Sequence, residues 1–480
     1  MDYFEHILGI ALLVLYWLFT AAVTLRVLAK RTPVSVTLSW LLVIYILPVL
    51  GAALYLMLGE LNLGRQRARR AEAMVEPFLD SIAEDFHAPV GSLPRGSLVQ
   101  GIHQMLQQRL GQGALGYQQL ELLDNPEQIF TRLCQDVASA QQSIHLETYI
   151  WFPGGRVDTL SEALIAAAAR GVKVSLLIDH AGSRPFFRSP WRKRLIDAGI
   201  EVVPALPVRL LRALAQRIDL RLHRKLVVID GKVAYSGSMN IADPRYFKKE
   251  AKVGQWIDVM LRVEGPAAHG LNKVFAWDWE LETGLRRLAP APENPPACDN
   301  WLSVLPSGPG TGEDLIGQGV LSSIYRANDS ITISTPYFVP SEAIFDALCQ
   351  AARRGVRVRV LVPQRNDSRM VSWASRAYFE RLLESGGEIY LFAGGLLHTK
   401  AMLMDDQLAL VGSVNLDIRS LQLNFELTLA LFSPEGCASI RGLLDGYLRD
   451  STPLELERWK QRSRAARVLE RGMFFLSPLL

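Results

Sequence analysis

The hydrophobic pattern divides the chain into an apolar N-terminal part and a longer part where short apolar runs alternate with amphipathic stretches. Two long apolar runs, Ile7–Leu25 and Val36–Leu58, lie near the N-terminus. Each is long enough to cross a hydrocarbon layer of about 30 Å at about 1.5 Å per residue. The pattern predicts two transmembrane or hairpin helices within residues 1–60, with a buried pair of soluble helices as the alternative.

The first run lacks the pattern of a cleaved signal peptide. Acidic Asp2 and Glu5 precede it, its apolar stretch is long, and no small-residue cleavage site follows. Basic residues follow both runs, and two crossings would place these two groups on opposite sides of a membrane. Because the second group is slightly larger, we expect the rest of the chain on the cytoplasmic side. The two groups are Arg26, Lys30 and Arg31, and Arg65, Arg67, Arg69 and Arg70.

Beyond residue 115 the pattern occurs twice. The stretch "SIHLETYIWF" from Ser143 corresponds to "SITISTPYFV" from Ser330. Each is followed by a helical stretch and then a strand-like run, Val172–Ile178 in one case and Val356–Val362 in the other. This order predicts βαβ units with a mostly parallel, buried sheet. The length of 480 residues also favours several domains.

We therefore expect an α/β fold in which two copies of one domain are related by a pseudo-twofold axis. The first copy is predicted over residues 116–290 and the second over residues 300–480. A proline-rich joint, "APAPENPPACDN", separates them. Residues 61–115 are expected to form a juxtamembrane helix and linker.

Each copy carries the same polar motif. It begins at His223 with "HRKLVVIDGKVAYSGSMN" and at His398 with "HTKAMLMDDQLALVGSVN". Residues two apart on a strand face the same side, so each histidine projects together with its lysine, Lys225 or Lys400. Small polar residues that can bond an anion's oxygens complete each motif. They are Ser238 and Asn240, and Ser413 and Asn415.

An aspartate follows each histidine at the opposite strand parity. Asp230 and Asp405 stand at expected hairpin turns, so we expect each to brace its loop. Two further acidic residues, Asp258 in "GQWIDVML" and Glu426 in "LNFELTLA", are suited to orient a histidine through its second ring nitrogen. The sequence leaves open which carboxylate holds which histidine.

A cleft shared by both copies would hold two imidazoles, two ammonium groups and two carboxamides. The positive and N–H groups complement a phosphodiester and its transition state, so no metal is required. One imidazole can attack phosphorus while the other protonates the departing oxygen. Unperturbed histidine pKa values near 6.5 would allow one neutral and one protonated ring. The remaining histidines lack this setting and receive no role: His6, His87, His103, His145, His180 and His269.

Composition narrows the class of protein. Apolar residues make up 49% of the chain, which is high for a purely soluble protein. The net charge of +4 is a weak signal for nucleic acid, and we expect no such partner. The four cysteines are widely spaced without a CxxC pair, so neither a zinc site nor a disulfide framework is predicted.

On these motifs the chain resembles the phospholipase D superfamily, whose signature is the duplicated HKD motif, and within it the bacterial cardiolipin synthases. The resemblance extends to "YILPVLGAALYLMLGE", "DPRYF", "GQWID", "VNLDIRSLQLNFE" and the terminal "FFLSPLL". It implies mixed sheets flanked by helices. It also implies a catalytic set made of both HKD motifs: His223, Lys225, Asp230, His398, Lys400 and Asp405.

The resemblance further implies the reaction. Two phosphatidylglycerol molecules would give cardiolipin and glycerol through a phosphatidyl-histidine, without a cofactor. His223 would be the nucleophile and His398 the general acid and base, although the symmetry of the motifs allows the reverse. The lysines, Asn240 and Asn415 would hold the phosphoryl oxygens. A phospholipase D-type hydrolase is the alternative, and an inactive membrane scaffold is a third.

The implied partners are phosphatidylglycerol and anionic membrane lipids, and a homo-oligomer is compatible with the sequence. The implied location is the bacterial inner membrane, with several crossings. Three segments could rest on lipid: "PALPVRLLRALAQRIDLRL", "RPFFRSPWRKRL" and the C-terminal tail. Surface helices, core packing or a docked tail are the alternatives. The residues concerned include Arg209, Arg212, Arg217, Phe474, Phe475 and Leu476.

Overall fold

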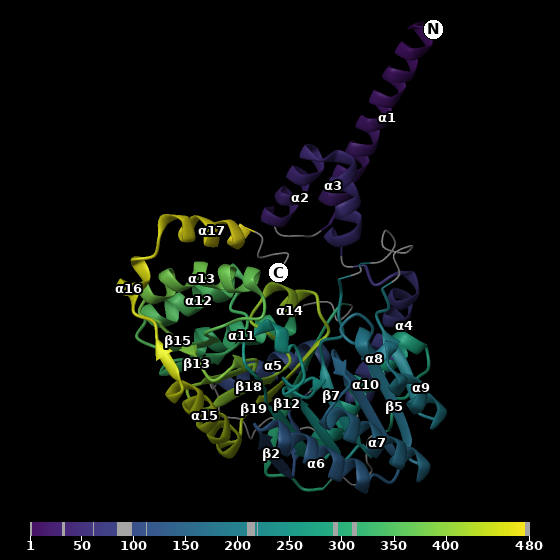
Figure 1. Ribbon diagram of the computed structural model, residues 1–480, viewed down its shortest axis with the longest axis vertical. Coiled ribbons are helices and arrows are strands. Elements are labelled where there is room, and N and C mark those ends of the chain that lie inside the picture. Colours follow the sequence, from purple (N-terminus) through teal and green to yellow (C-terminus); the bar gives the residue numbers. More distant parts are fainter. Residues whose placement is uncertain are drawn as a thin grey trace. The chain divides into compact units, whose positions relative to one another are not determined.

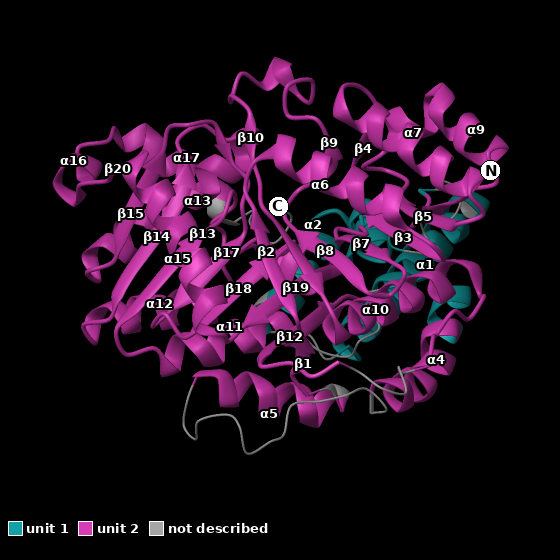
Figure 2. Cartoon of the chain, turned by 90° about the horizontal axis from the view of Figure 1, so that it is seen from below, with its two compact units in different colours: residues 1–69, 208–220 teal, residues 70–207, 221–480 magenta. Residues whose placement is uncertain are grey.

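The computed structural model describes residues 2–30, 34–60, 62–83, 98–111, 113–208, 217, 219–290, 296–309 and 314–475. The chain forms two compact units (Figure 2). The first unit contains residues 1–69 and 208–220, and the second contains residues 70–207 and 221–480. Apart from residues 208–220, the two repeated copies therefore belong to the second unit.

The first unit contains one long apolar helix, α1 (Asp2–Leu28), with α2 (Val34–Ile46) and α3 (Pro48–Leu54) beside its C-terminal end (Figure 1). Among the described residues, only the stretch Phe4–Leu28 is long and apolar enough to cross a membrane. A short π-helix, η1 (Tyr55–Gly59), follows α3.

The prediction of a second continuous helix over Val36–Leu58 is wrong. Pro48 has no backbone N–H, and Leu47 before it adopts φ −128° and ψ 70°, outside the helical region. The chain therefore breaks between α2 and α3. At about 1.5 Å per residue, the 13 residues of α2 cover about 20 Å, less than the thickness of a hydrocarbon layer.

The broken segment returns to the end of α1. Glu60, just beyond η1, accepts a hydrogen bond from Arg26 Nε at 2.6 Å and lies 3.6 Å from Lys30 Nζ. Residue 60 therefore lies beside residues 26–30. Nothing in this contact supports the expectation that a second crossing separates the two basic groups.

The first sheet of the second unit has seven strands in the order β2-β11-β8-β7-β3-β5-β6. They are β2 (Gln119–Leu123), β3 (Ser143–Thr148), β5 (Lys173–Asp179), β6 (Glu201–Ala205), β7 (Lys225–Ile229), β8 (Val233–Gly237) and β11 (Met260–Glu264). Its helices are α6 (Pro126–Ser139), α7 (Arg156–Ala169), α8 (Arg184–Arg188), α9 (Pro190–Asp197) and α10 (Pro266–Thr283).

The second sheet has nine strands in the order β1-β12-β19-β18-β17-β13-β14-β15-β20. They are β1 (Leu115–Tyr117), β12 (Asn300–Ser307), β13 (Ser330–Ser334), β14 (Arg357–Pro363), β15 (Glu388–Phe392), β17 (Ala401–Met404), β18 (Leu408–Gly412), β19 (Glu426–Leu431) and β20 (Ser451–Pro453). Its helices are α11 (Leu315–Arg326), α12 (Glu342–Arg353), α13 (Arg369–Glu384), α14 (Ile418–Gln422), α15 (Pro434–Arg449), α16 (Leu456–Lys460) and α17 (Arg464–Phe475).

The duplicated α/β fold is confirmed, with mixed sheets. Within each sheet only the βαβ part is parallel, β3-β5-β6 in one and β13-β14-β15 in the other. The other pairings are antiparallel, so the expectation of mostly parallel sheets holds only for these strands. Short pairs complete the unit: β4 (Trp151–Phe152) with β9 (Ile241–Ala242), and β10 (Trp256–Ile257) with β16 (Leu396–Leu397).

The second copy also uses residues from before the first. β1 pairs antiparallel with β12, whereas β2, only a few residues later, pairs with β11 of the first sheet. Helix α5 (Leu98–Leu110) buries Leu98, Ile102 and Leu106 in the core of the second copy. This part of the expected linker is therefore core structure, and residue 116 does not separate the two sheets. The other helix of the expected linker is α4 (Arg65–Ala83).

The three candidate lipid-contact segments are only partly described. Phe186 in α8 is fully buried against Trp151, which assigns this aromatic ring to the core. Arg209 and Arg212 lie outside the described residues, and Arg217 pairs with Asp219 at 2.6 Å.

The C-terminal tail is docked as far as it is described. In α17 the buried Glu470 lies 3.4 Å from Arg462, and Met473 packs on the second core. The side chains of Phe474 and Phe475, and Leu476 as a whole, lie outside the described residues.

Candidate active site

The two HKD motifs meet through backbone bonds between the copies. The His223 N–H donates to the Phe425 carbonyl at 2.9 Å, and the His398 N–H donates to the Ile257 carbonyl at 2.9 Å. Phe425 and Ile257 each directly precede a candidate carboxylate. The equivalent bonds in both directions form a pseudo-twofold junction, and this junction places both histidines at one cleft.

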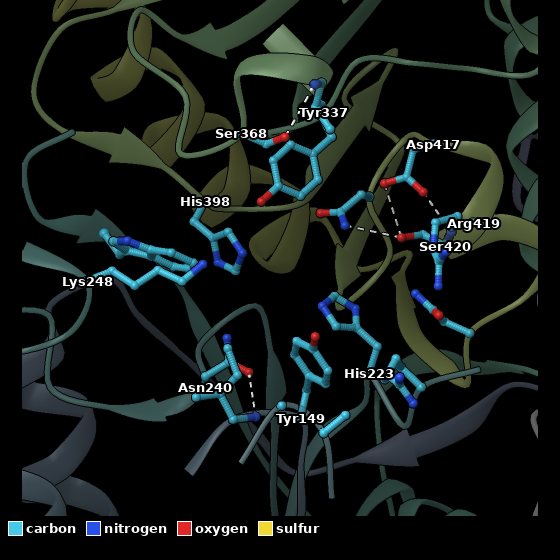
Figure 3. Close-up of a pocket in the computed structure, with 18 of the residues that line it drawn as sticks. Tyr149, His223, Asn240, Lys248, Tyr337, Ser368, His398, Asp417, Arg419 and Ser420 are labelled. Atoms are coloured by element: carbon cyan, nitrogen blue, oxygen red, sulfur yellow. Dashed lines mark hydrogen bonds between the residues drawn. The ribbon is translucent and has the colours of Figure 1, made fainter. Parts of the chain in front are cut away.

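Each histidine is held by the carboxylate of the other copy. His223 Nδ1 lies 2.8 and 2.9 Å from the two oxygens of Glu426, and His398 Nδ1 lies 2.7 Å from Asp258 Oδ1. Both carboxylates are buried. A carboxylate at Nδ1 favours the tautomer with its proton there and leaves Nε2 to face the substrate. The pairing that the sequence leaves open is thus crossed between the copies. Figure 3 shows the two histidines at the same pocket.

The structure places Ser238 and Ser413 behind the carboxylates, not on the cleft wall. The Ser413 hydroxyl donates to Glu426 Oε2 at 2.5 Å and accepts the Leu427 N–H at 2.9 Å. Ser238 accepts the Val259 N–H at 3.0 Å, next to Asp258. We predicted that these two serines contact the substrate. In the structure their hydroxyls instead hold the segments that carry the carboxylates.

Asp230 and Asp405 lie away from the cleft. Asp230 accepts the backbone N–H groups of residues 141–143 at 2.7–2.9 Å, and Asp405 accepts those of residues 328–330 at 2.8 Å. Both have positive φ, 53° and 49°, as their hairpin turns require. Each aspartate ties its hairpin to the start of β3 or β13. The geometry therefore gives Asp230 and Asp405 a structural role and no contact with the substrate.

The two lysines lie in the buried floor of the site. Lys225 and Lys400 each donate from Nζ to the carbonyl of their own motif histidine at 2.6 Å. Burial lowers the pKa of Lys225 to about 8 and that of Lys400 to about 7, although nearby carboxylates oppose this. Below about pH 7 both side chains are ammonium donors for the oxygens of an anionic group.

Burial also changes the expected histidine titration. It lowers the pKa of His223 and of His398 to about 4, against the raising effect of the paired carboxylates, and the lysines lower both further. The expectation of pKa values near 6.5 is therefore wrong, because rings with pKa values of about 4 are neutral at pH 7.

The two asparagines face the cleft differently. Asn240 Oδ1 accepts the Ile150 N–H at 3.2 Å, which leaves its amide N–H groups for a ligand. Asn415 Nδ2 donates to the Ser420 hydroxyl at 3.1 Å instead. The motifs are thus equivalent in sequence but not in the groups that they present.

The cleft has a volume of about 640 Å³ and includes residues that sequence reasoning missed. Tyr149 packs edge-on against His223 at 5.0 Å, and Trp256 lies 4.4 Å from His398, both measured between ring centroids. Further wall residues are Arg221, Lys248, Tyr337, Asp417, Arg419, Ser420 and Asn424. The sequence could have indicated three of these residues, because Arg221, Asn424 and Trp256 each stand two residues before a motif histidine or its carboxylate.

Two paired sheets with crossed histidine–carboxylate pairs at one cleft define a phospholipase D-like protein, and comparison with known families agrees. A family model described as "Cardiolipin synthase, PLD-like domain" matches residues 133–279 and 320–445. A second, described as "Phospholipase_D-nuclease N-terminal", matches residues 13–60.

Similar proteins narrow the class further. The chain is 46% identical to cardiolipin synthase A of Cronobacter sakazakii and 47% identical to that of Yersinia pseudotuberculosis. Each match covers 97% of both chains. The chain belongs to the cardiolipin synthase family of phospholipase D-like enzymes. The crystal structure of phosphatidylserine synthase from Haemophilus influenzae shares the fold, with a TM-score of 0.60 at 14% identity over 80% of this chain and all of that chain.

Proposed function

We propose that this enzyme transfers a phosphatidyl group from one phosphatidylglycerol to another, giving cardiolipin and glycerol. The observation that carries the proposal is the crossed pairing of His223 with Glu426 and of His398 with Asp258 at a single cleft. Two oriented imidazoles are what a two-step transfer at phosphorus requires. The names of the similar proteins supply the product, cardiolipin, and the superfamily resemblance implies phosphatidylglycerol as the substrate.

In the first step, the neutral Nε2 of one histidine attacks the phosphorus of the first lipid. The bond from phosphorus to the glycerol oxygen breaks, and the other histidine donates its proton to that oxygen. Lys225, Lys400 and Asn240 bind the phosphoryl oxygens, on which negative charge grows. A phosphatidyl-histidine and free glycerol result.

In the second step, a head-group hydroxyl of the second lipid gives its proton to the histidine that acted as acid. Its oxygen attacks phosphorus, the phosphorus–nitrogen bond breaks, and cardiolipin leaves. Both rings regain their starting state. The near-symmetric pairs accommodate either order of roles, and the superfamily resemblance implies His223 as the nucleophile.

The proton for the first step is taken up from solvent when the substrate binds. Burial lowers the pKa of both histidines to about 4. A bound phosphodiester places negative charge between them and raises the pKa of each. We propose that the site acquires its proton on lipid binding, while the carboxylates keep both rings oriented.

We propose that the protein is anchored in the bacterial inner membrane by α1, with the α2–α3–η1 segment as a re-entrant hairpin. The ion pairs of Glu60 with Arg26 and Lys30 support a return to the same side. Both basic groups then share one side, and the excess of positive charge favours the cytoplasm for this side and for the catalytic part. This replaces the expectation of several crossings by a single one.

Reporter fusions test this arrangement. Fusions at the N-terminus and after residue 62 should report opposite sides of the membrane, whereas two crossings would give the same side. A homo-oligomer stays a prediction.

The reaction is tested with purified full-length protein in phosphatidylglycerol vesicles. Cardiolipin and glycerol in equal amounts are expected, and His223→Ala and His398→Ala should each abolish both. Phosphatidic acid as the main lipid product would instead establish the phospholipase D-type hydrolase and refute the proposal.

A further inference from the structure

The two copies differ in the loop that follows the motif asparagine. From Asn240 to the carboxylate Asp258 the chain advances 18 positions (258 − 240), whereas from Asn415 to Glu426 it advances 11 (426 − 415). The first copy therefore has seven extra residues (18 − 11) in this loop. We call residues 243–254 the first-copy loop. The pseudo-twofold relation gives this loop no equivalent of the same length in the second copy.

The first-copy loop is anchored at both ends. Asp243 is buried and accepts two backbone N–H groups at 3.0 and 3.1 Å. Phe247 is also buried, and its ring centroid lies 5.0 Å from that of Trp256. At the other end, Gly254 lies so close to Gly395 of the second copy that a Cβ on Gly254 would meet the Gly395 Cα at 2.9 Å. The loop is therefore a fixed part of the cleft wall.

Lys248 carries a positive charge from this loop to the His398 end of the cleft. Its backbone has φ 46° and ψ 40°, in the left-handed region that few residues other than glycine adopt. Its Nζ lies 5.2 Å from the ring centroid of Trp256, and that ring lies 4.4 Å from the ring of His398. Figure 3 shows Lys248 beside His398. One indole ring therefore separates the ammonium group from the second motif histidine.

A carboxylate of the second copy holds the ammonium group in place. Lys248 Nζ donates to Asp367 Oδ2 at 3.1 Å, and Asp367 Oδ1 accepts the Tyr337 hydroxyl at 2.9 Å. An ammonium group has three N–H donors, and this contact uses one of them. The Lys248 side chain is 42% exposed and lines the cleft, whereas that of Asp367 is only 7% exposed. A ligand in the cleft therefore meets the cation and not its counter-ion.

We propose that Lys248 binds the phosphate of the second phosphatidylglycerol, so that the first-copy loop selects an anionic acceptor. The inference rests on the proposed function and adds the residue that recognises the second substrate. In cardiolipin a single glycerol joins two phosphates. When the hydroxyl at one end of this glycerol reacts beside His398, the phosphate at its other end lies one glycerol length farther along the cleft wall, where Lys248 supplies the positive charge.

The first step of the reaction does not need Lys248. The head group of the donor lipid is a glycerol that ends in hydroxyls, so only the second lipid brings another phosphate to this end of the cleft. A hydroxyl that arrives beside His398 gives its proton to His398 and approaches phosphorus opposite the nitrogen of His223. The subsite therefore fits the order of roles in which the phosphatidyl bond forms on His223.

The test compares a neutral acceptor with an anionic one in the same vesicles. Full-length enzyme in phosphatidylglycerol vesicles with labelled glycerol can form cardiolipin and can also exchange labelled glycerol into phosphatidylglycerol. Exchange needs only a small neutral acceptor, whereas cardiolipin formation needs the second lipid. In Lys248→Gln, cardiolipin formation should fall roughly tenfold or more, as expected for loss of a charge-assisted hydrogen bond, while glycerol exchange stays within about threefold. Lys248→Arg keeps the positive charge and should retain most of the cardiolipin formation.

The same loop offers a matched control. Lys252 also has a left-handed backbone, with φ 55°, but it is exposed and is not among the residues that line the cleft, so Lys252→Gln should change neither rate. Equal loss of both reactions in Lys248→Gln, or no loss in either, would overturn the subsite. Selective loss of cardiolipin formation in Arg419→Gln instead would place the second phosphate at the His223 end and would also overturn it. Wild-type enzyme that catalyses neither reaction would refute the proposed function itself.

Discussion

Replacing Glu426 by glutamine tests the crossed pairing most directly. The carboxylate accepts hydrogen bonds from His223 Nδ1 at 2.8 and 2.9 Å, from Ser413 at 2.5 Å and from Asn424 at 3.3 Å. His223 Nδ1 and the Asn424 amide can only donate here, whereas the Ser413 hydroxyl can also accept if it turns to the Leu427 carbonyl at 3.3 Å. An amide has only one acceptor oxygen, so the NH2 group of a glutamine cannot replace both carboxylate oxygens.

The size of the effect follows from these contacts. Hydrogen bonds to a charged group contribute about 1.5–3 kcal/mol each, and a neutral bond to the remaining oxygen keeps about 1 kcal/mol. Loss of the charge-assisted bond that holds the imidazole, and of a second one, leaves a deficit of about 2–5 kcal/mol when the ring becomes cationic. At about 1.36 kcal/mol per factor of ten, kcat should fall by between about one and a half and four orders of magnitude.

The pH dependence separates positioning from a merely structural role. Glu426 raises the pKa of Lys225, which burial lowers to about 8. Without that charge the ammonium form is lost at lower pH, so the Glu426→Gln defect should be larger at pH 8.5 than at pH 6.5. Asp258→Asn should behave alike, because Asp258 raises the pKa of Lys400 in the same way.

The assay is the initial rate of cardiolipin formation across pH, with circular dichroism and thermal unfolding to verify the fold. Glu388→Gln is the matched control, since Glu388 makes a surface ion pair with Arg357 at 2.9 Å in the same sheet and should leave kcat unchanged. A folded Glu426→Gln enzyme that keeps more than a third of wild-type kcat would refute the reasoning. A defect of equal size at both pH values would show that the carboxylate does not support the lysine charge.

Other outcomes can be checked on the same material. Because burial lowers the pKa of Lys400 to about 7 and that of Lys225 to about 8, kcat/KM should fall as pH rises through 7–8, where the ammonium groups lose their protons. Asp405→Ala removes the acceptor of three backbone N–H bonds, so urea unfolding should show a loss of about 2–4 kcal/mol while the folded fraction keeps kcat within about threefold. Phe186→Ala empties a fully buried position and should cost about 3–5 kcal/mol by thermal unfolding, whereas Ile196→Ala, 45% exposed, should cost about 1 kcal/mol or less.

Strand parity and the internal repeat were enough to predict the duplicated fold and the central groups of the site. Strand parity predicted that Asp230 and Asp405 do not face the substrate with their histidines. In the structure both accept backbone N–H groups that hold their hairpins in place. The same rule could not pair Asp258 and Glu426 with a histidine. That pairing depends on backbone bonds between segments 140 to 203 residues apart, which no local pattern encodes.

The errors also have local causes. Ser238 and Ser413 were expected at the substrate because small polar residues suit an anion. They directly follow β8 and β18, where their hydroxyls lie beside the buried carboxylates Asp258 and Glu426. The second apolar run was judged by length alone, although Pro48 within it interrupts helical hydrogen bonding. Histidine pKa values near 6.5 were expected because burial cannot be read from a motif.

The placement of α5 affects how the protein can be synthesised. Leu98, Ile102 and Leu106 leave the ribosome early, but their partners in α11 and around β12 follow about 200 residues later, which is roughly 10–40 s at about 5–20 residues per second. During that interval the apolar face of α5 stays exposed, so the nascent chain is a ready substrate for chaperones. Truncated chains that stop before β12 should therefore aggregate or remain chaperone-bound, even though they contain every strand of the first sheet.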